Sequence, residues 1–472
     1  MEPEVFASLV KLNPAASQTL VVQLYRAVRE HVLAGRLQAD DRLPGSRVAA
    51  ASLGIGRNTV NAAYDLLLAD GIIEIAARGA PRVACLPLAG VPAARTAARL
   101  SVRAHEAVIP VRQGLAEGTL APGSPDPALF PADHWGRSLR RAARYRQDGA
   151  QGYGHYSGLP QLRAAVADQL RQHRGLAADP DDIIITPGTQ ASLVLAAMVL
   201  ADPGERALVE SPGYPGAIAG LRAAGLDCQP LPVDGRGADP ACADWSGVRL
   251  VYVTPSTQYP TGVRMATDRR AALVEQASSA GAVIIEDDYD YEFLWAGQGL
   301  AALAAMPGIG ANLYLGSAAK SLLPALRLGW MVATPDLAEP LRAMQARLGL
   351  AANVHVQAAF AETLASGSYR SHLGRVARTY KERLGLLLAA IESEFGSRIT
   401  LSRPAGGLQL VIRCGDDRDD QRLRARLNAA GFAVAALSDH CLGTPEKGLV
   451  VGFGSATPAS AHAFARMLAA LV

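Results

Sequence analysis

The feature that most constrains the fold is an alternation of short apolar runs with helical stretches, which begins near residue 180. The runs are bounded by Gly, Pro and polar turns, a pattern typical of buried strands. Strands that alternate with helices build an α/β domain around a mainly parallel sheet. We therefore predict strands at residues 182–186, 207–210, 249–253, 283–286, 313–315 and 329–332.

The last hundred residues follow a different pattern. A long helix is predicted from about residue 368 to 395, and two strands are predicted near 408–412 and 449–452. The large domain, residues 116–472, should therefore carry a smaller C-terminal α+β subdomain over about residues 370–472.

Two further segments precede this domain. Residues 86–115 are rich in Ala, Pro and Arg and lack a sustained amphipathic period, which predicts a linker. Residues 17–85 are predicted to form a small, mainly helical domain. The chain should therefore be multidomain.

The small domain has the order of a winged helix-turn-helix. Three predicted helices, near residues 20–37, 46–53 and 58–70, are followed by two short strands. In this organisation the third helix enters the major groove of DNA. At its start stand Arg57, Asn58 and Thr59, which are residue types that contact bases and phosphates. Arg47 could hold a phosphate and Arg78 lies on the predicted wing, although each arginine could equally be a solvated surface charge.

This domain resembles the GntR-type winged helix. The resemblance is carried by LPGSR (43–47), LGIGRNTV (53–60) and DGII (70–73). The family usually has Ser where Gly45 and Gly56 stand. The resemblance implies binding to double-stranded promoter DNA.

The large domain holds the parts of a pyridoxal phosphate site. This cofactor needs a lysine for a Schiff base and a carboxylate beside its pyridine nitrogen. Lys320 lies in apolar surroundings, and Asp287 ends an apolar strand. Gly188 and Thr189 form a strand-to-helix turn whose backbone N–H groups could bind phosphate. Read separately, these segments could be a partly buried lysine, an acidic cluster and a plain helix cap.

In order along the chain, these segments resemble fold-type I aminotransferases from about residue 120 to 472, and with the first domain the chain is similar to the MocR/GabR family of regulators. The matching segments are GTQ (188–190), ESPGY (210–214), TPSTQYPTG (254–262), EDDYDYEF (286–293) and the lysine segment up to Arg327.

The resemblance implies a role for each residue around the cofactor ring. Lys320 would form the internal aldimine, and Asp287, rather than Asp288, would pair with the pyridine nitrogen. Tyr289 would hydrogen-bond the ring hydroxyl and Tyr214 would stack on the ring. Ser256 stands where aminotransferases commonly have the asparagine that also contacts the hydroxyl.

At the phosphate end, the resemblance implies Gly188, Thr189, Ser317 and Arg327 as ligands. Tyr153 matches a tyrosine that reaches the phosphate of the neighbouring subunit. That match implies a homodimer with its sites at the interface.

Two departures bear on the ligand. Aminotransferases usually carry an arginine near Val450 that clamps a substrate carboxylate, and GABA-sensing relatives have an arginine at the position of Gly216. Both are absent here, so a GABA-like carboxylate ligand is disfavoured. The sequence therefore favours a transcriptional regulator that senses pyridoxal phosphate, or an amine that forms an aldimine at Lys320. The alternatives are an active aminotransferase with an accessory DNA-binding domain, or a dimer scaffold with a degenerate site.

Other function classes find little support. The five cysteines include no CxxC pair, which argues against a zinc or disulfide framework, and we predict no metal site. No apolar run approaches the roughly 18 residues that span a bilayer, and the acidic start has no secretory signal. We expect a cytoplasmic protein without a membrane partner.

Overall fold

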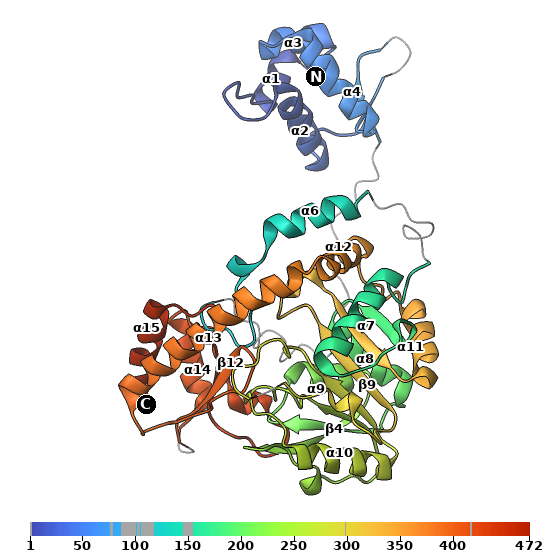
Figure 1. The fold of residues 1–472 in the computed structure, drawn as a ribbon. Coiled ribbons are helices and arrows are strands. Elements are labelled where there is room, and N and C mark those ends of the chain that lie inside the picture. The colour runs from blue at the N-terminus through green and yellow to red at the C-terminus, as the bar shows by residue number, and fades with distance from the viewer. Residues whose placement is uncertain are drawn as a thin grey trace. The chain divides into compact units, whose positions relative to one another are not determined.

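The computed structural model describes residues 2–75, 79–85, 101, 104, 118–144, 154–297, 299–415 and 418–472. The chain forms two compact units, residues 1–99 and residues 100–472 (Figure 1). Almost all of the predicted linker, 86–115, lies outside the described residues. No helix among those described is long and apolar enough to cross a membrane.

The first unit is a winged helix-turn-helix. Its antiparallel wing pairs Ile73 with Val83. The Tyr64 hydroxyl donates a hydrogen bond of 2.9 Å to the Pro44 carbonyl, which ties α4 to the loop before α3. The elements are α1 (Pro3–Leu9), α2 (Leu20–Leu33), α3 (Ser46–Leu53), α4 (Arg57–Ala69), β1 (Ile73–Glu74) and β2 (Arg82–Val83).

The core of this unit includes a helix that our sequence interpretation left out. We placed the start of the domain at residue 17, but Phe6 of α1 is fully buried and Val10 lies beside it in the same cluster. They pack with Leu24 and Val28 of α2 and with Val60 of α4. The folded unit therefore begins at α1.

The second unit is built on an eight-stranded sheet in the order β3-β10-β9-β8-β7-β4-β5-β6. The pairs β4–β5, β4–β7, β7–β8 and β8–β9 are parallel. β10 runs antiparallel to β3 and β9. The strands are β3 (Ile183–Thr186), β4 (Arg206–Ser211), β5 (Asp227–Asp234), β6 (Gly237–Ala238), β7 (Val248–Val253), β8 (Val283–Asp287), β9 (Asn312–Ser317) and β10 (Gly329–Ala333).

Helices cover both faces of this sheet (Figure 1). Along β3, Ile184 packs in the cluster formed with α8, α9 and α11, whereas Ile183 and Ile185 pack in the cluster formed with α7 and α12. Further along the sheet, Val251 packs against α10. The helices are α7 (Pro160–Arg174), α8 (Thr189–Leu200), α9 (Pro215–Ala223), α10 (Thr267–Ala280), α11 (Pro335–Leu348) and α12 (Val354–Ala365).

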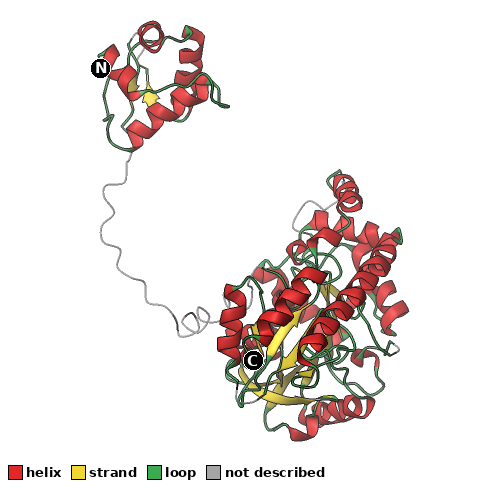
Figure 2. Cartoon of the chain, turned by 90° about the vertical axis from the view of Figure 1, so that its left-hand side faces the viewer, coloured by secondary structure: helices red, strands yellow, loops and turns green. Residues whose placement is uncertain are grey.

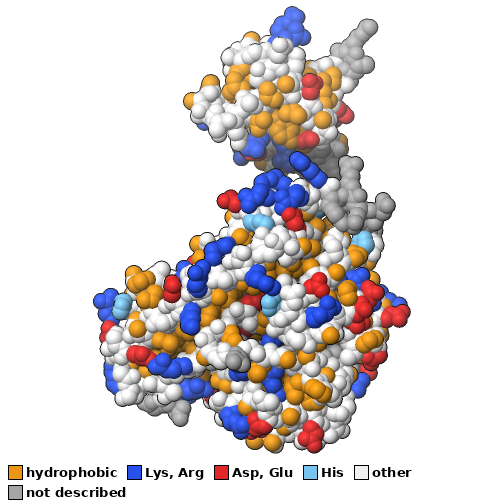
Figure 3. Space-filling view, viewed as in Figure 1, with side chains coloured by type: hydrophobic (Ala, Val, Ile, Leu, Met, Phe, Trp, Pro, Cys, Tyr) orange, Lys and Arg blue, Asp and Glu red, His pale blue; other side chains and the backbone are white. Residues whose placement is uncertain are grey.

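Helix α6 (Ala132–Ala142) is strongly amphipathic. It buries Trp135 and Ala142 in the cluster with α12, and Arg141 forms an ion pair with Glu362 of that helix. Its three arginines, Arg137, Arg140 and Arg141, are exposed, and Figure 3 shows Lys and Arg side chains gathered over this part of the surface.

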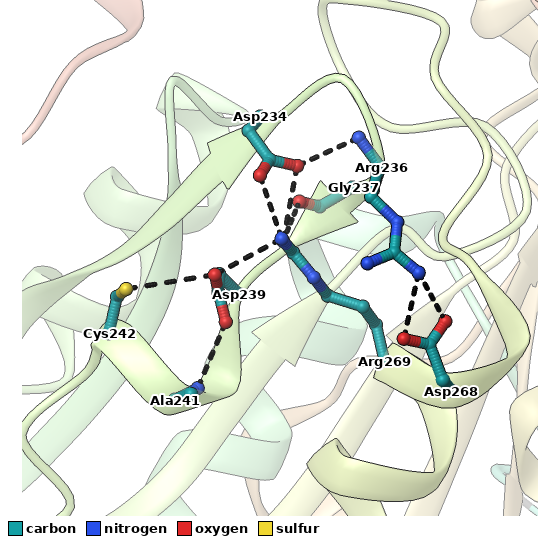
Figure 4. Close-up of polar contacts among 8 residues, drawn as sticks. All are labelled: Asp234, Arg236, Gly237, Asp239, Ala241, Cys242, Asp268 and Arg269. Carbon is teal, nitrogen blue, oxygen red and sulfur yellow. Dashed lines mark hydrogen bonds and ion pairs between the residues drawn. The ribbon is translucent and has the colours of Figure 1, made fainter.

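An ion-pair network ties the β5–β6 hairpin to α10 (Figure 4). Arg269 of α10 binds Asp234 at 2.7 Å and Asp239 at 3.1 Å. Arg236 in the turn binds Asp268 at 2.7 Å. The hairpin at the sheet edge is therefore held by charge as well as by its short strand pairing.

The C-terminal part forms a separate antiparallel sheet in the order β11-β12-β14-β13. Figure 2 shows the strands of the second unit, in yellow, flanked by helices, in red. Leu410 of β12 and Phe464 of α15 share its core with Tyr380 of α13. The elements are α13 (Ser368–Phe395), β11 (Thr400–Leu401), β12 (Gln409–Arg413), α14 (Asp420–Ala429), β13 (Ala435–Ala436), β14 (Leu449–Gly452) and α15 (Pro458–Ala469). The predicted fold class, a winged helix followed by an α/β domain with a smaller α+β part, is confirmed.

Candidate functional site

The candidate site of the large domain lies where neighbouring strands end. Asp287 is the last residue of β8, and Lys320 follows β9 by three residues. Tyr252 stands on β7 and Tyr214 follows β4. Since β4, β7, β8 and β9 are parallel, these residues come to the same edge, where α/β sheets bind ligands.

Lys320 is held at this edge by a backbone oxygen. Its Nζ donates a hydrogen bond of 2.6 Å to the Gly123 carbonyl. Gly123 has a φ of 62°, and a β-carbon placed on it would lie 3.2 Å from Nζ. Burial lowers the lysine pKa, although Asp290 and Asp287 oppose that effect. A lowered pKa increases the fraction of free amine, the form that attacks an aldehyde.

Asp287 presents one paired and one unpaired oxygen. Oδ2 accepts a hydrogen bond of 2.7 Å from the Tyr252 hydroxyl, whereas Oδ1 is buried without a partner in the described part of the chain. Burial raises the pKa of Asp287 to about 7. An N–H donor on a cationic ring would satisfy Oδ1 and return the group to its ionised form. Asp287 therefore fits a protonated pyridine nitrogen.

The neighbouring Asp288 has a different set of partners. Its Oδ2 accepts hydrogen bonds from Arg174 Nε at 2.6 Å and from the Tyr314 hydroxyl at 2.8 Å. Arg174 and Asp288 are both buried, so the ion pair is part of the domain interior. Asp287 and Asp288 are neighbours of the same residue type, and their partners distinguish them: both donors bind Asp288 Oδ2, whereas Asp287 Oδ1 has no partner among the described residues.

An anion cradle forms at the start of α8. Gly188, with φ of 102°, is the N-cap and provides no side-chain cap for the first turn. The Arg327 guanidinium lies over Gly188. A β-carbon placed on this glycine would be only 3.6 Å from Arg327 Cζ. Thr189 opens the helix, and the Ser317 hydroxyl accepts a hydrogen bond of 3.0 Å from the Ala319 amide. Open helix N–H groups beside an arginine fit a phosphate.

Aromatic rings line the other end of the site. The Tyr259 ring centre lies 5.5 Å from that of Tyr214 and 6.1 Å from that of Tyr289, both in edge contacts. The Tyr289 hydroxyl donates to the Thr257 carbonyl at 3.1 Å and accepts from Gln409 Nε2 at 3.3 Å. Our sequence interpretation missed Tyr259 and Gln409. The signal for Tyr259 was its place directly before the Pro-Thr-Gly turn.

Ser256 is turned to different partners. Its hydroxyl accepts a hydrogen bond of 2.7 Å from Arg174 Nη2, the arginine that also binds Asp288. Ser256 as a neighbour of the cofactor ring stays a prediction, and Tyr259 is a second residue that lies against Tyr289. The predicted Tyr153 lies outside the described residues.

The two positions at which arginine is missing are filled in different ways. Val450 is fully buried in an apolar cluster with Val411 and Leu437. A β-carbon on Gly216 would lie 2.4 Å from Tyr214 Cζ, so a side chain there would displace the Tyr214 ring.

In the first unit, the predicted DNA-contacting residues lie at the starts of two helices. Arg47 is exposed in the first turn of α3. Arg57 and Asn58 are exposed at the start of α4 and Thr59 is half-buried. Arg57 Nε donates to the Ser46 hydroxyl at 3.4 Å, which links the two helix starts. Arg78 lies outside the described residues.

Comparison with known proteins covers both units. Residues 20–83 match the family of bacterial regulatory proteins of the gntR type. Residues 123–448 match the aminotransferase class I and II family.

Full-length relatives have the same combination. The chain is 35% identical to the probable rhizopine catabolism regulatory protein MocR of Rhizobium meliloti, over 92% of this chain and 90% of the relative. It is 31% identical to the pyridoxine biosynthesis transcriptional regulator PdxR of Corynebacterium glutamicum, over 94% of both chains.

A solved structure resembles the large domain. It is LysN, an alpha-aminoadipate aminotransferase from Thermus thermophilus, complexed with N-(5'-phosphopyridoxyl)-L-leucine. The similarity has a TM-score of 0.68 and 27% identity, and covers 79% of this chain and 96% of LysN. The chain therefore belongs to the MocR-type transcriptional regulators, in which a gntR-family winged helix is joined to a pyridoxal phosphate-dependent domain with the aminotransferase fold.

Proposed function

We propose that this regulator is a cytoplasmic homodimer that binds promoter DNA through its winged helices and senses pyridoxal phosphate, or an amine that reacts with it, at Lys320. The observation that carries the proposal is that Lys320 and Asp287 lie close enough for the carboxylate to act on the pKa of the amine. A partly buried amine with a lowered pKa lies near a carboxylate that has one oxygen fixed by Tyr252 and the other unpartnered.

The remaining residues around Lys320 can be assigned to the ring of the cofactor. Asp287 Oδ1 would accept a hydrogen bond from the pyridine nitrogen, and Tyr214 would cover one face of the ring. Tyr289 would bind the ring hydroxyl, with Ser256 and Tyr259 beside it. When bound, pyridoxal phosphate supplies an aldehyde for amines and a ring that withdraws electrons.

The phosphate would lie in the cradle at the start of α8. Gly188 and Thr189 would offer backbone and hydroxyl donors, and Arg327 and Ser317 would complete the set. Tyr153 of the partner subunit is proposed as a further ligand, which makes the dimer part of the site.

On DNA, α4 would enter the major groove. Arg57, Asn58 and Thr59 would contact base edges or phosphates there, while Arg47 and Arg78 would bind the backbone. A dimer carries two winged helices, so the operator should have two half-sites.

Transamination is the second candidate, because Lys320 and Asp287 would serve it equally well. The apolar surroundings of Val450 weigh against it, since no fork of hydrogen bonds for a carboxylate can form from that position. Transamination would be supported if absorbance measurements showed that pyridoxamine phosphate forms when an amino acid donor is added.

The test is DNA binding with and without cofactor. Full-length protein would be stripped of pyridoxal phosphate and then reloaded, and its affinity for its own upstream DNA measured at fixed salt. We expect affinity or footprint to change with the cofactor. Lys320→Ala should lose this response, whereas Lys381→Ala, at an exposed lysine on α13, should keep it. Equal DNA binding in both states and in the presence of amines would contradict sensing.

A further inference from the structure

Beyond the residues assigned to the cofactor, a second carboxylate lies beside Lys320. Asp290 is 1% exposed and its Oδ2 has no partner among the described residues. Its charge acts on the Lys320 amine more strongly than that of Asp287 does. Burial raises the pKa of Asp290 well above its usual value, and a hydrogen bond from the Thr257 side chain acts in the opposite direction.

Gln409 points a second acceptor toward the same place. The side chain is fully buried, and its Oε1 has no partner in the described part of the chain. A β-carbon on Gly123 would lie 3.2 Å from Lys320 Nζ and 3.5 Å from Gln409 Oε1, so the two atoms flank the same glycine. Gln409 and Asp290 flank a second glycine in the same way. A β-carbon placed on Gly407 would lie 3.4 Å from Gln409 Nε2 and 2.8 Å from Asp290 Oδ2.

Both of these oxygens are acceptors that lack a donor among the described residues. Gln409 uses its amide nitrogen on the Tyr289 hydroxyl, which leaves the carbonyl oxygen directed at the site. Asp290 Oδ2 is buried and receives no donor from the described residues. Buried acceptors without donors are costly, so a ligand that brings donors is favoured.

The acidic groups around this place determine which charge a ligand group can carry there. Asp290 and Asp287 both lie close enough to Lys320 to act on its pKa. A ligand ammonium placed here would lower the pKa of Asp290 and favour its ionised form, and a hydroxyl would find an acceptor, whereas a ligand carboxylate would raise that pKa further.

We propose that Asp290 and Gln409 form the specificity site of this regulator and select a primary amine that carries a second hydrogen-bond donor, an ammonium or a hydroxyl, and no carboxylate. The inference rests on the proposed sensing function and adds to it the chemical class of the effector.

Four probes with the same four-carbon chain test it. They are 1,4-diaminobutane, 4-aminobutan-1-ol, n-butylamine and 4-aminobutanoate, which differ only at the end away from the amine. Binding to cofactor-loaded, full-length protein would be measured by titration calorimetry. We expect the diamine or the amino alcohol to bind about tenfold more tightly than butylamine, the loss expected for one charge-assisted hydrogen bond. The carboxylate should bind more weakly than butylamine. The stronger of the first two identifies the second donor.

Two variants should move this preference in opposite directions. Asp290→Asn removes the charge at nearly constant volume and should reduce the advantage of the diamine about tenfold. Gln409→Glu adds a charge and should increase it. Asp268→Asn, on the surface of α10, is the matched control and should keep the wild-type order.

The outcomes separate this inference from the proposed function. Butylamine binding as tightly as the diamine and the amino alcohol, or tightest binding of 4-aminobutanoate, overturns the inference, and so does the absence of binding by all four. Selective diamine or amino-alcohol binding that leaves DNA affinity unchanged would support the ligand class and contradict sensing.

Discussion

Arg327 lies across the bare face of Gly188, with its guanidinium carbon 3.6 Å from the point that a β-carbon would occupy. Arg327 itself has a φ of 48°, a left-handed conformation that is uncommon for a residue with a side chain. A non-glycine residue held there is sustained by its surroundings and often marks a functional position.

The replacement Gly188→Ala tests this relationship. A methyl group would meet the guanidinium and would also strain a backbone with φ of 102°. We expect cofactor affinity to fall about tenfold or more, measured by titration of the stripped protein with pyridoxal phosphate. Gly281→Ala is the control, since Gly281 has φ of 67° with nothing within 4 Å. Equal loss in both variants would attribute the effect to backbone strain alone.

Tyr252→Phe tests the fixing of Asp287. The change removes the hydroxyl that donates to Asp287 Oδ2 at 2.7 Å and keeps the ring in the core. A hydrogen bond to a charged group is worth about 1.5–3 kcal/mol, so cofactor affinity should fall roughly tenfold or more. Fluorescence titration would measure it. Unchanged affinity would mean that Asp287 needs no support from Tyr252.

The pKa of Asp287 predicts a pH effect on the cofactor-free protein. Burial raises it from 3.8 to about 7, so between those values the folded chain holds a proton that the unfolded chain releases. This group's contribution to the free energy of unfolding should therefore fall as pH rises from about 4 to 7, by up to about 1.4 kcal/mol per pH unit. Asp287→Asn should show a shallower fall in urea unfolding of the large domain. A slope equal to that of the wild type would show that Asp287 is already ionised.

Two residues of the winged helix should differ in what they contribute to DNA binding. Arg47→Ala should weaken binding to all sequences alike and reduce the salt slope by about 1, as for a phosphate contact. Asn58→Ala should cost about 1–3 kcal/mol on the operator and relax base preference at one position. Competition binding at several salt concentrations separates the two. Equal losses on operator and random DNA for Asn58→Ala would assign it to the backbone.

Most of the large domain could be predicted from sequence because its strands are buried on both faces and read as apolar runs. The longest strand that was not predicted is β5, which has polar ends and contains Pro230 and Pro232. Proline cannot donate to a ladder, so it argues against a strand. β5 pairs with β4 along most of its length, but with β6 only at Val233 and Asp234. On the β6 side, both prolines therefore lie outside the ladder, where a missing donor is tolerated.

Some side chains of the site could be predicted from sequence and others could not. Asp287 and Lys320 were predictable from their positions at strand ends and from the family resemblance. The direction of Ser256 was not, because it depends on Arg174, which comes from α7, 82 residues earlier in the chain. Gln409 was missed because it comes from the C-terminal sheet, which no local pattern connects to Lys320.

The burial of Phe6 has a practical meaning for anyone who wishes to use the DNA-binding unit alone. The gntR match begins at residue 20, downstream of α1. A fragment cut there would lose Phe6 and Val10 and expose the apolar residues of α2 that they cover. The segment that folds is thus longer than the segment that matches the gntR family. A portable DNA-binding module from this protein should start before α1, and a fragment that starts at the family boundary should be prone to aggregation.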